Sequence, residues 1–141
     1  MDKSAFELPW QQAFEFVEAT LGGRIISVER QERWRTAFYI NVEVPGGGVT
    51  PVYYRGARDQ DTGGLNIRHE YNILCALEKN GIEVPKLYGF CEEPAGIVMA
   101  WVPGKFDLEK NAANDAEVNA VMQHYMEIMA RVHQGPIDDF V

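Results

Sequence analysis

A carboxylate on the apolar side of a predicted helix is the first feature that could do chemistry. Glu70 is followed by Leu74 and Leu77 at intervals of four and seven residues, so all three side chains share one helix face. A buried carboxylate must be paired with a cation or it becomes protonated. Arg55 supplies a cation where the predicted strand Pro51–Tyr54 ends. A cation held by a carboxylate between a strand and a helix is how kinase-type sites present positive charge to phosphate oxygens.

The alternative is that Glu70 lies at the helix rim and pairs in solvent with Arg68 or Lys79. Helical spacing alone leaves both interpretations open. We predict a salt bridge between Arg55 and Glu70 across the interface of the helix and the sheet.

Four segments in a fixed order carry a family resemblance. They are Tyr53–Arg55, the Arg68–Glu70 tripeptide with Leu74 and Leu77 behind it, Gly81–Tyr88, and Val98–Gly104. Together they resemble the aminoglycoside phosphotransferase and choline kinase-like superfamily, above all the bacterial branch related to the kinase-like domain of acyl-CoA dehydrogenases. The resemblance covers roughly residues 23–104, with a weaker echo at Arg131–His133.

The resemblance implies a role for each matching position. Arg55 would contact the phosphates of ATP, and Glu70 would be its helix partner. A hinge whose backbone N–H and C=O groups read the adenine edge would consist of Met99, Ala100, Trp101 and Val102. The segment Glu32–Thr36 would lie where a loop covers the phosphates.

Three positions depart from the family pattern. The segment Glu32–Thr36 has no glycine, although glycines let backbone N–H groups approach a phosphate most easily. Trp34 and two arginines in that segment could stack and pair instead. Ala100 replaces the usual hinge glutamate, and Gly56 follows Arg55 where a second basic residue is common. These departures favour the alternative function, a non-catalytic binding or interaction module.

The family's catalytic loop, His-x-Asp followed by Asn, does not occur in the sequence. None of His69, His124 and His133 has an aspartate two positions later. Phosphoryl transfer needs a base that orients the acceptor hydroxyl and carboxylates that hold Mg²⁺. We therefore assign no catalytic residue, expect these groups to lie beyond Val141 in a lobe that is missing here, and predict that the chain alone is inactive.

Two other patterns are weaker. Gly46–Gly48 could cradle a phosphate, but no helix and no Lys-Ser/Thr pair follow it, so a hairpin turn is the better interpretation. His69, Cys75 and Cys91 do not have the spacing of a zinc site, and we predict no metal site. A disulfide between Cys75 and Cys91 is the alternative to two reduced, buried thiols, and we expect the thiols.

Composition excludes some partners. The 141 residues are 46% hydrophobic and 24% charged, with a formal net charge of −8. Nucleic acids and anionic membranes require clustered Lys and Arg, so neither is an expected partner. No apolar run reaches the ~18 residues of a membrane span, and residues 1–6 have no signal-peptide pattern. We expect a cytoplasmic protein.

The elements that must position these residues follow from periodicity and turn signals. The predicted order is a helix, three strands, a helix, two strands and a helix, which indicates an α+β fold rather than βαβ alternation. The expected helices are an amphipathic one from about Trp10 to a stop at Gly22–Gly23, one over 66–80, and one that begins near Asp115. The expected strands are 24–31, 37–44, 49–55, one within 82–90, and 96–102.

This order is that expected for a protein-kinase-like N-lobe: an antiparallel sheet of about five strands with a covering helix that carries Glu70, plus the N-terminal helix. We expect this lobe over residues 1–104, and a linker with the first helix of a truncated C-lobe over 105–141. The last helix carries a wide apolar stripe from Val118 to Val132. An exposed stripe of that size would drive association, so the stripe must either fold back on the sheet or pair with a second copy. We favour pairing, as a symmetric homodimer through this helix.

Overall fold

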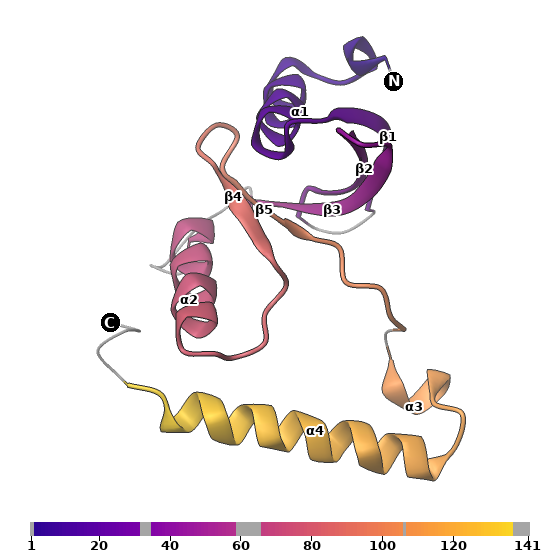
Figure 1. Ribbon diagram of the computed structural model, residues 1–141, viewed down its shortest axis with the longest axis vertical. Coiled ribbons are helices and arrows are strands. Elements are labelled where there is room, and N and C mark those ends of the chain that lie inside the picture. Colours follow the sequence, from indigo (N-terminus) through magenta and orange to yellow (C-terminus); the bar gives the residue numbers. More distant parts are fainter. Residues whose placement is uncertain (1, 32–34, 59–65, 106, 137–141) are drawn as a thin grey trace. The chain divides into compact units, whose positions relative to one another are not determined.

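The computed structural model describes residues 2–31, 35–58, 66–105 and 107–136. Figure 1 shows the chain coloured along its sequence. The described elements are η1 (Lys3–Ala5), α1 (Leu8–Leu21), β1 (Arg24–Arg30), β2 (Ala37–Val44), β3 (Gly48–Gly56), α2 (Ile67–Lys79), β4 (Leu87–Cys91), β5 (Gly96–Ala100), α3 (Leu108–Asn111) and α4 (Asp115–Gln134). None of the helices in these ranges combines the length and the hydropathy that crossing a membrane requires.

The chain divides into two compact units. The first comprises Met1–Asn72 and Pro85–Trp101, and the second comprises Ile73–Val84 and Val102–Val141. The first unit holds η1, α1, the whole sheet and the beginning of α2. The second holds the end of α2, α3 and α4.

The sheet of the first unit is antiparallel and has the strand order β1-β2-β3-β5-β4. This confirms the expected α+β class and the five antiparallel strands; the kinase-like N-lobe stays a prediction. The expected alternation in β2 is also confirmed, since Phe38, Ile40 and Val42 are buried while Tyr39 and Asn41 are only half-buried.

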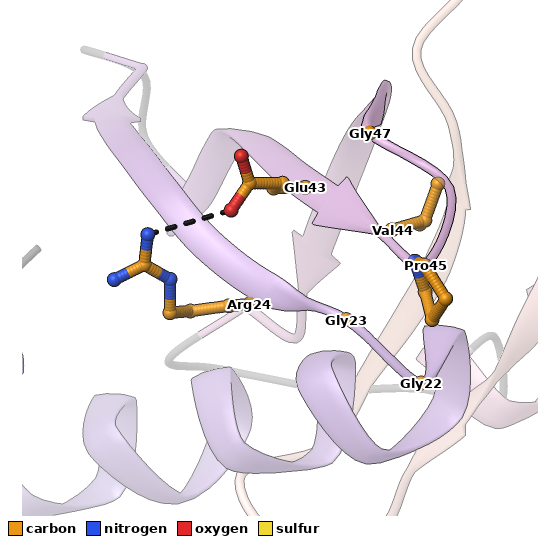
Figure 2. Close-up of a pocket in the computed structure, with 7 residues that line it drawn as sticks. All are labelled: Gly22, Gly23, Arg24, Glu43, Val44, Pro45 and Gly47. Atoms are coloured by element: carbon orange, nitrogen blue, oxygen red, sulfur yellow. Dashed lines mark hydrogen bonds and ion pairs between the residues drawn. The ribbon is translucent and has the colours of Figure 1, made fainter.

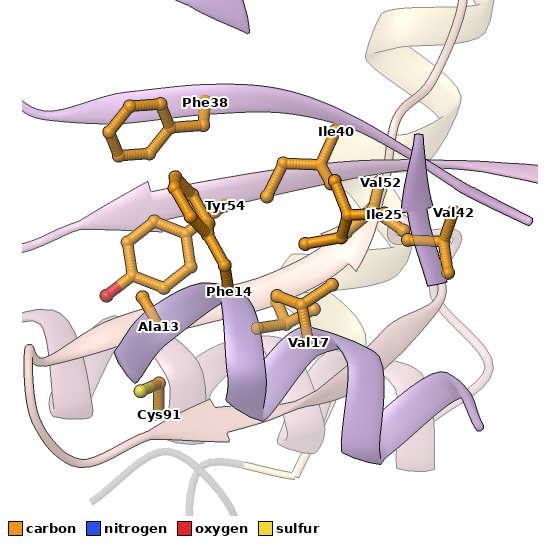
Figure 3. Packing of buried hydrophobic residues seen from close by; sticks show 11 residues of the cluster. Ala13, Phe14, Val17, Ile25, Phe38, Ile40, Val42, Val52, Tyr54 and Cys91 are labelled. Carbon is orange, nitrogen blue, oxygen red and sulfur yellow. The ribbon is translucent and has the colours of Figure 1, made fainter. Parts of the chain in front are cut away.

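One face of the sheet packs against α1 and forms the core (Figure 3). Apolar residues at helical spacing form one apolar face of α1, and alternate residues of the strands form one apolar face of the sheet. The two faces pack against each other. Phe14 of α1 lies edge-on to Phe38 of β2, with ring centroids 5.2 Å apart. The buried cluster comprises Ala13, Phe14, Val17, Ile25, Phe38, Ile40, Val42, Val52, Tyr54, Cys91 and Val98.

Three predicted helix boundaries are explained by the residues at the helix ends. Gly22 ends α1 in the left-handed conformation, with φ 63°, and its N–H donates to the carbonyl of Glu18. Gly81, with φ 71°, follows α2 in the same way. The last helix begins one residue after Asn114, whose side chain accepts from the N–H of Glu117.

The structure differs from the expectation in which helix covers the core. We expected the helix with Glu70 to cover the sheet, but α1 supplies every helical residue of the buried cluster. In the first unit α2 reaches the sheet through its first residues: Tyr71 packs on the ring of Phe90, with centroids 5.4 Å apart. Two short helices, η1 and α3, were not predicted from the sequence.

Candidate functional site

The candidate site lies on the face of the sheet opposite α1. Successive residues of a strand point to opposite faces. Because Tyr54 of β3 is fully buried in the α1 core, its neighbours Tyr53 and Arg55 belong to the other face. The register of the sheet then places Tyr39 of β2 and Met99 of β5 beside Tyr53.

Glu70 of α2 binds two arginines at the end of this face. Arg55 Nε lies 2.5 Å from Glu70 Oε1, and Arg35 Nη1 lies 3.5 Å from Glu70 Oε2. The predicted Arg55–Glu70 salt bridge is therefore confirmed. The alternative pairing with Arg68 is not found, because Arg68 forms an ion pair with Glu92 and its guanidinium lies over the ring of Phe90.

Three arginines gather in the described part of this cluster. Arg35 is 7% exposed, and burial is the main reason that its pKa is lowered. Repulsion from Arg55 and Arg58 lowers the pKa of Arg35 further, while Glu70 acts in the opposite direction. A guanidinium stays protonated at any physiological pH, so all three side chains are cationic.

The pair with Glu70 engages only part of Arg55. Its Nε atom is buried against Glu70 Oε1, while the side chain as a whole is 30% exposed. A guanidinium carries five N–H donors, so the contact at Nε does not use all of them. The end of β3 is therefore suited to receive an anion.

A row of aromatic rings lies next to the arginines. The ring centroids of Tyr39 and Tyr53 are 5.3 Å apart, and those of Tyr39 and Trp101 are 5.1 Å apart. Gln31 fixes both tyrosines, because its Nε2 donates to the hydroxyl of Tyr39 and its Oε1 accepts from the hydroxyl of Tyr53. Trp101 is 43% exposed. The row offers flat apolar surface to a planar ligand.

The predicted hinge residues are placed differently from one another. Met99 is 7% exposed and lies beside Tyr53. The N–H of Ala100 donates to the carbonyl of Lys86, and that of Trp101 donates to the carbonyl of Pro51. These two N–H groups are engaged within the protein, and the adenine contact expected of Met99 to Val102 stays a prediction. Val102 is exposed and belongs to the second unit.

The expected phosphate-covering segment is described only in part. Residues 32–34 lie outside the described residues, and Arg35 and Thr36 lie inside them. Arg35 is the member of that segment that reaches Glu70. Sequence reasoning suggested that arginines there could pair, but it did not assign Arg35 to the site.

The glycine-rich segment forms the predicted hairpin turn. Gly46 and Gly47 have positive φ angles, and the N–H of Gly47 donates to the carbonyl of Val44, closing the turn between β2 and β3. A hollow of about 320 Å³ lies beside it, lined by Gly22, Gly23, Arg24, Glu43, Val44, Pro45 and Gly47 (Figure 2). Arg24 there pairs with Glu43 at 3.4 Å, so a single arginine lines this hollow, whereas two arginines meet at Glu70.

Metal binding finds no support in the described ranges, where His, Cys, Asp and Glu form no group of three or more that could hold an ion. Cys75 and Cys91 are free thiols. Cys91 is buried, and burial raises the pKa of its thiol. Cys75 is only half-buried, which differs from the expected burial of both.

Comparison of the chain with models of protein families, with curated proteins and with solved structures gives no match.

Proposed function

We propose that the chain binds a nucleotide on the face of the sheet opposite α1, with phosphates at the cluster of Arg35, Arg55 and Glu70 and the base beside the aromatic row. The observation that carries the proposal is that Arg35 and Arg55 meet at the carboxylate of Glu70, at the end of the face that also carries the aromatic row. Phosphate oxygens would accept from the guanidinium of Arg55, whose side chain is 30% exposed.

The distance between cations and rings fits a single nucleotide. Tyr53 and Arg55 are two residues apart on β3, which separates their backbone positions by roughly 7 Å. A phosphate at Arg55 therefore leaves room for a sugar and a base over Tyr53 and Tyr39. Stacking of a base on an aromatic ring contributes about 1–3 kcal/mol.

The wider proposal is the nucleotide-binding lobe of a small-molecule phosphotransferase that transfers the γ-phosphate of ATP to a hydroxyl. The family resemblance and the strand-to-helix pair of Arg55 and Glu70 support it. The His-x-Asp base and the carboxylates for Mg²⁺ would have to come from residues outside this sequence. ATP with Mg²⁺ is therefore expected to bind without turnover.

A second candidate is a non-catalytic binding module that keeps the lobe for a nucleotide or a protein partner. The engaged N–H groups of Ala100 and Trp101 favour it, because they remove two hydrogen-bond donors from the proposed adenine contact. The two candidates differ in base selectivity: hinge contacts would discriminate adenine from guanine, whereas stacking on the aromatic row tolerates either base.

Calorimetric titration with ATP and Mg²⁺ tests the binding proposal. Arg55→Ala removes one charge-assisted contact, worth about 1.5–3 kcal/mol, so we expect affinity to fall roughly 10- to 150-fold. Arg24→Ala is the matched control, since it removes the same charge from an exposed pair with Glu43. Equal effects of the two substitutions would count against the site. Turnover of ATP by the purified chain that Arg55→Ala abolishes would contradict the expectation of binding without catalysis.

A further inference from the structure

Helix α4 exposes large apolar side chains in the second unit. Val121, Met122, Tyr125 and Met126 are 44%, 47%, 53% and 60% exposed. They lie near the middle of a 20-residue helix, whose length is about 30 Å. An apolar surface of this kind on a helix is typical of an interaction site.

The apolar residues follow the spacing of a helix-pairing seam. Val118, Met122, Tyr125, Met129 and Val132 are separated by four, three, four and three residues. This is the repeat with which two helices pack side chains of one into the gaps of the other. A seam with this repeat is self-complementary, because a second copy of the same helix presents the same pattern.

The polar contact of α4 in its own unit uses another side of the helix. Glu83 lies 3.4 Å from Arg131 and 3.7 Å from His124. His124 and Arg131 are seven residues apart and share one side of α4. This contact leaves the seam of Met122, Tyr125 and Met129 uninvolved.

We propose that the seam is a self-association surface on which two copies of the chain pair through α4 in antiparallel orientation. Charge complementarity supports the second copy and the orientation. Asp115 in the first turn of α4 and His133 in the last turn flank the seam on the side away from Arg131. An antiparallel pair places Asp115 of each helix beside His133 of the other, whereas a parallel pair places two Asp115 carboxylates together. Such a pair has the two-fold symmetry common among homodimers.

The net charge of −8 on each copy opposes this pairing at long range. Salt screens that repulsion over about 10 Å at 0.1 M, but leaves contacts between buried apolar side chains intact. The dimer is therefore expected to gain stability as salt rises from low concentration to about 0.1 M.

Sedimentation equilibrium of the full chain at micromolar concentration tests the proposal. We expect a dimer for the unmodified chain and for Ala130→Glu, which adds a carboxylate on a side of α4 away from the seam. Tyr125→Glu adds the same charge within the seam, and we expect it to weaken the dimer at least about 100-fold. Circular dichroism checks that each variant keeps its helices.

A second pair of variants tests orientation. Asp115→Lys and His133→Glu should each weaken the dimer, and their combination should restore it, because the exchanged charges meet across an antiparallel pair. A combination that remains as weak as the single variants would overturn the antiparallel assignment. A monomer for the unmodified chain at every concentration would show that the seam is not a self-association surface and that the chain covers it. A dimer insensitive to Tyr125→Glu would show that the two copies pair elsewhere.

Discussion

Glu70 is the residue on which the proposed site depends, because a single carboxylate holds two arginines. Arg55 and Arg35 approach different oxygens of it, so each carboxylate oxygen faces one cation. Without this carboxylate the guanidiniums would repel each other at the partly buried end of β3. A phosphate bound at this site would therefore neutralise the same two arginines that Glu70 neutralises.

Replacing Glu70 by Gln should make stability depend on phosphate. We expect the free energy of unfolding to fall by about 1–3 kcal/mol, since a partly buried cation pair loses its counter-charge. Added tripolyphosphate should recover more stability in this variant than in the unmodified chain, because a ligand of the folded state stabilises it by mass action.

Chemical denaturation with and without tripolyphosphate measures this effect. Glu92→Gln is the control: Glu92 pairs with Arg68 at a surface where its side chain is 79% exposed, and its loss should change stability little. If tripolyphosphate stabilises the Glu70 and Glu92 variants equally, the cluster at Arg55 is not an anion site.

At the scale of elements, the junction between α1 and β1 is fixed by one acidic side chain. Glu18 Oε1 accepts from the N–H of Ile25 at 2.8 Å, and Glu18 Oε2 lies 2.5 Å from Lys3 Nζ. Burial acts to raise the pKa of Glu18, but the bonds from Lys3 and Ile25 outweigh it and hold that pKa below the ordinary value of 4.5. The carboxylate thus ties η1 and the start of β1 to the helix that covers the core.

This junction should make stability sensitive to acid. Because the pKa of Glu18 is lower in the folded chain than in the unfolded chain, its contribution is fully present above about pH 4.5 and is lost as the pH falls below that value. Glu18→Gln should lower the free energy of unfolding at pH 7 by about 1–3 kcal/mol and reduce its decline between pH 5 and about pH 3.

Urea denaturation over this pH range provides the measurement, with the exposed Glu15→Gln as the control. A pH profile of Glu18→Gln that runs parallel to that of the unmodified chain would mean that Glu18 has no part in the acid response.

The elements themselves could largely be predicted from the sequence, because their signals are local. Alternation from Phe38 to Val42 and the glycines at 46–48 gave β2 and its hairpin, and Gly22 and Gly81 gave the helix ends. The choice between α1 and α2 as the core helix is not local. Both helices carry apolar faces, and only the packed sheet shows that the ring of Phe38 meets α1. The helix α3 has four residues, too few to show a period.

The site could be predicted in part for the same reason. Arg55 and Glu70 could be predicted because the end of a strand and the apolar face of a helix both follow from local sequence patterns. The aromatic row depends on the register that sets Tyr39 opposite Tyr53 and on the hydrogen bonds of Gln31, neither of which has a local signal. The engaged N–H groups of Ala100 and Trp101 likewise follow from pairing with distant residues.

At the scale of the whole molecule, a net charge of −8 coexists with a cluster of arginines at the end of β3. An anionic ligand would be repelled at long range, so its binding depends on short-range contacts with the arginines. The location of a bound nucleotide therefore tests the site. A ligand attracted only by long-range charge would not bind specifically at the end of β3.

A titration of isotope-labelled chain with ATP and Mg²⁺, followed residue by residue by NMR at about 0.1 M salt, locates the bound nucleotide. We expect saturable shift changes that are largest at Arg55, Tyr53 and Tyr39, with much smaller changes at Arg24 and Gly47 beside the hollow of Figure 2. Adenosine alone should affect the tyrosines more than Arg55, and tripolyphosphate alone should do the reverse. Saturation centred on Arg24 and Gly47, or no saturable change at millimolar ATP, would contradict a nucleotide site at Arg55.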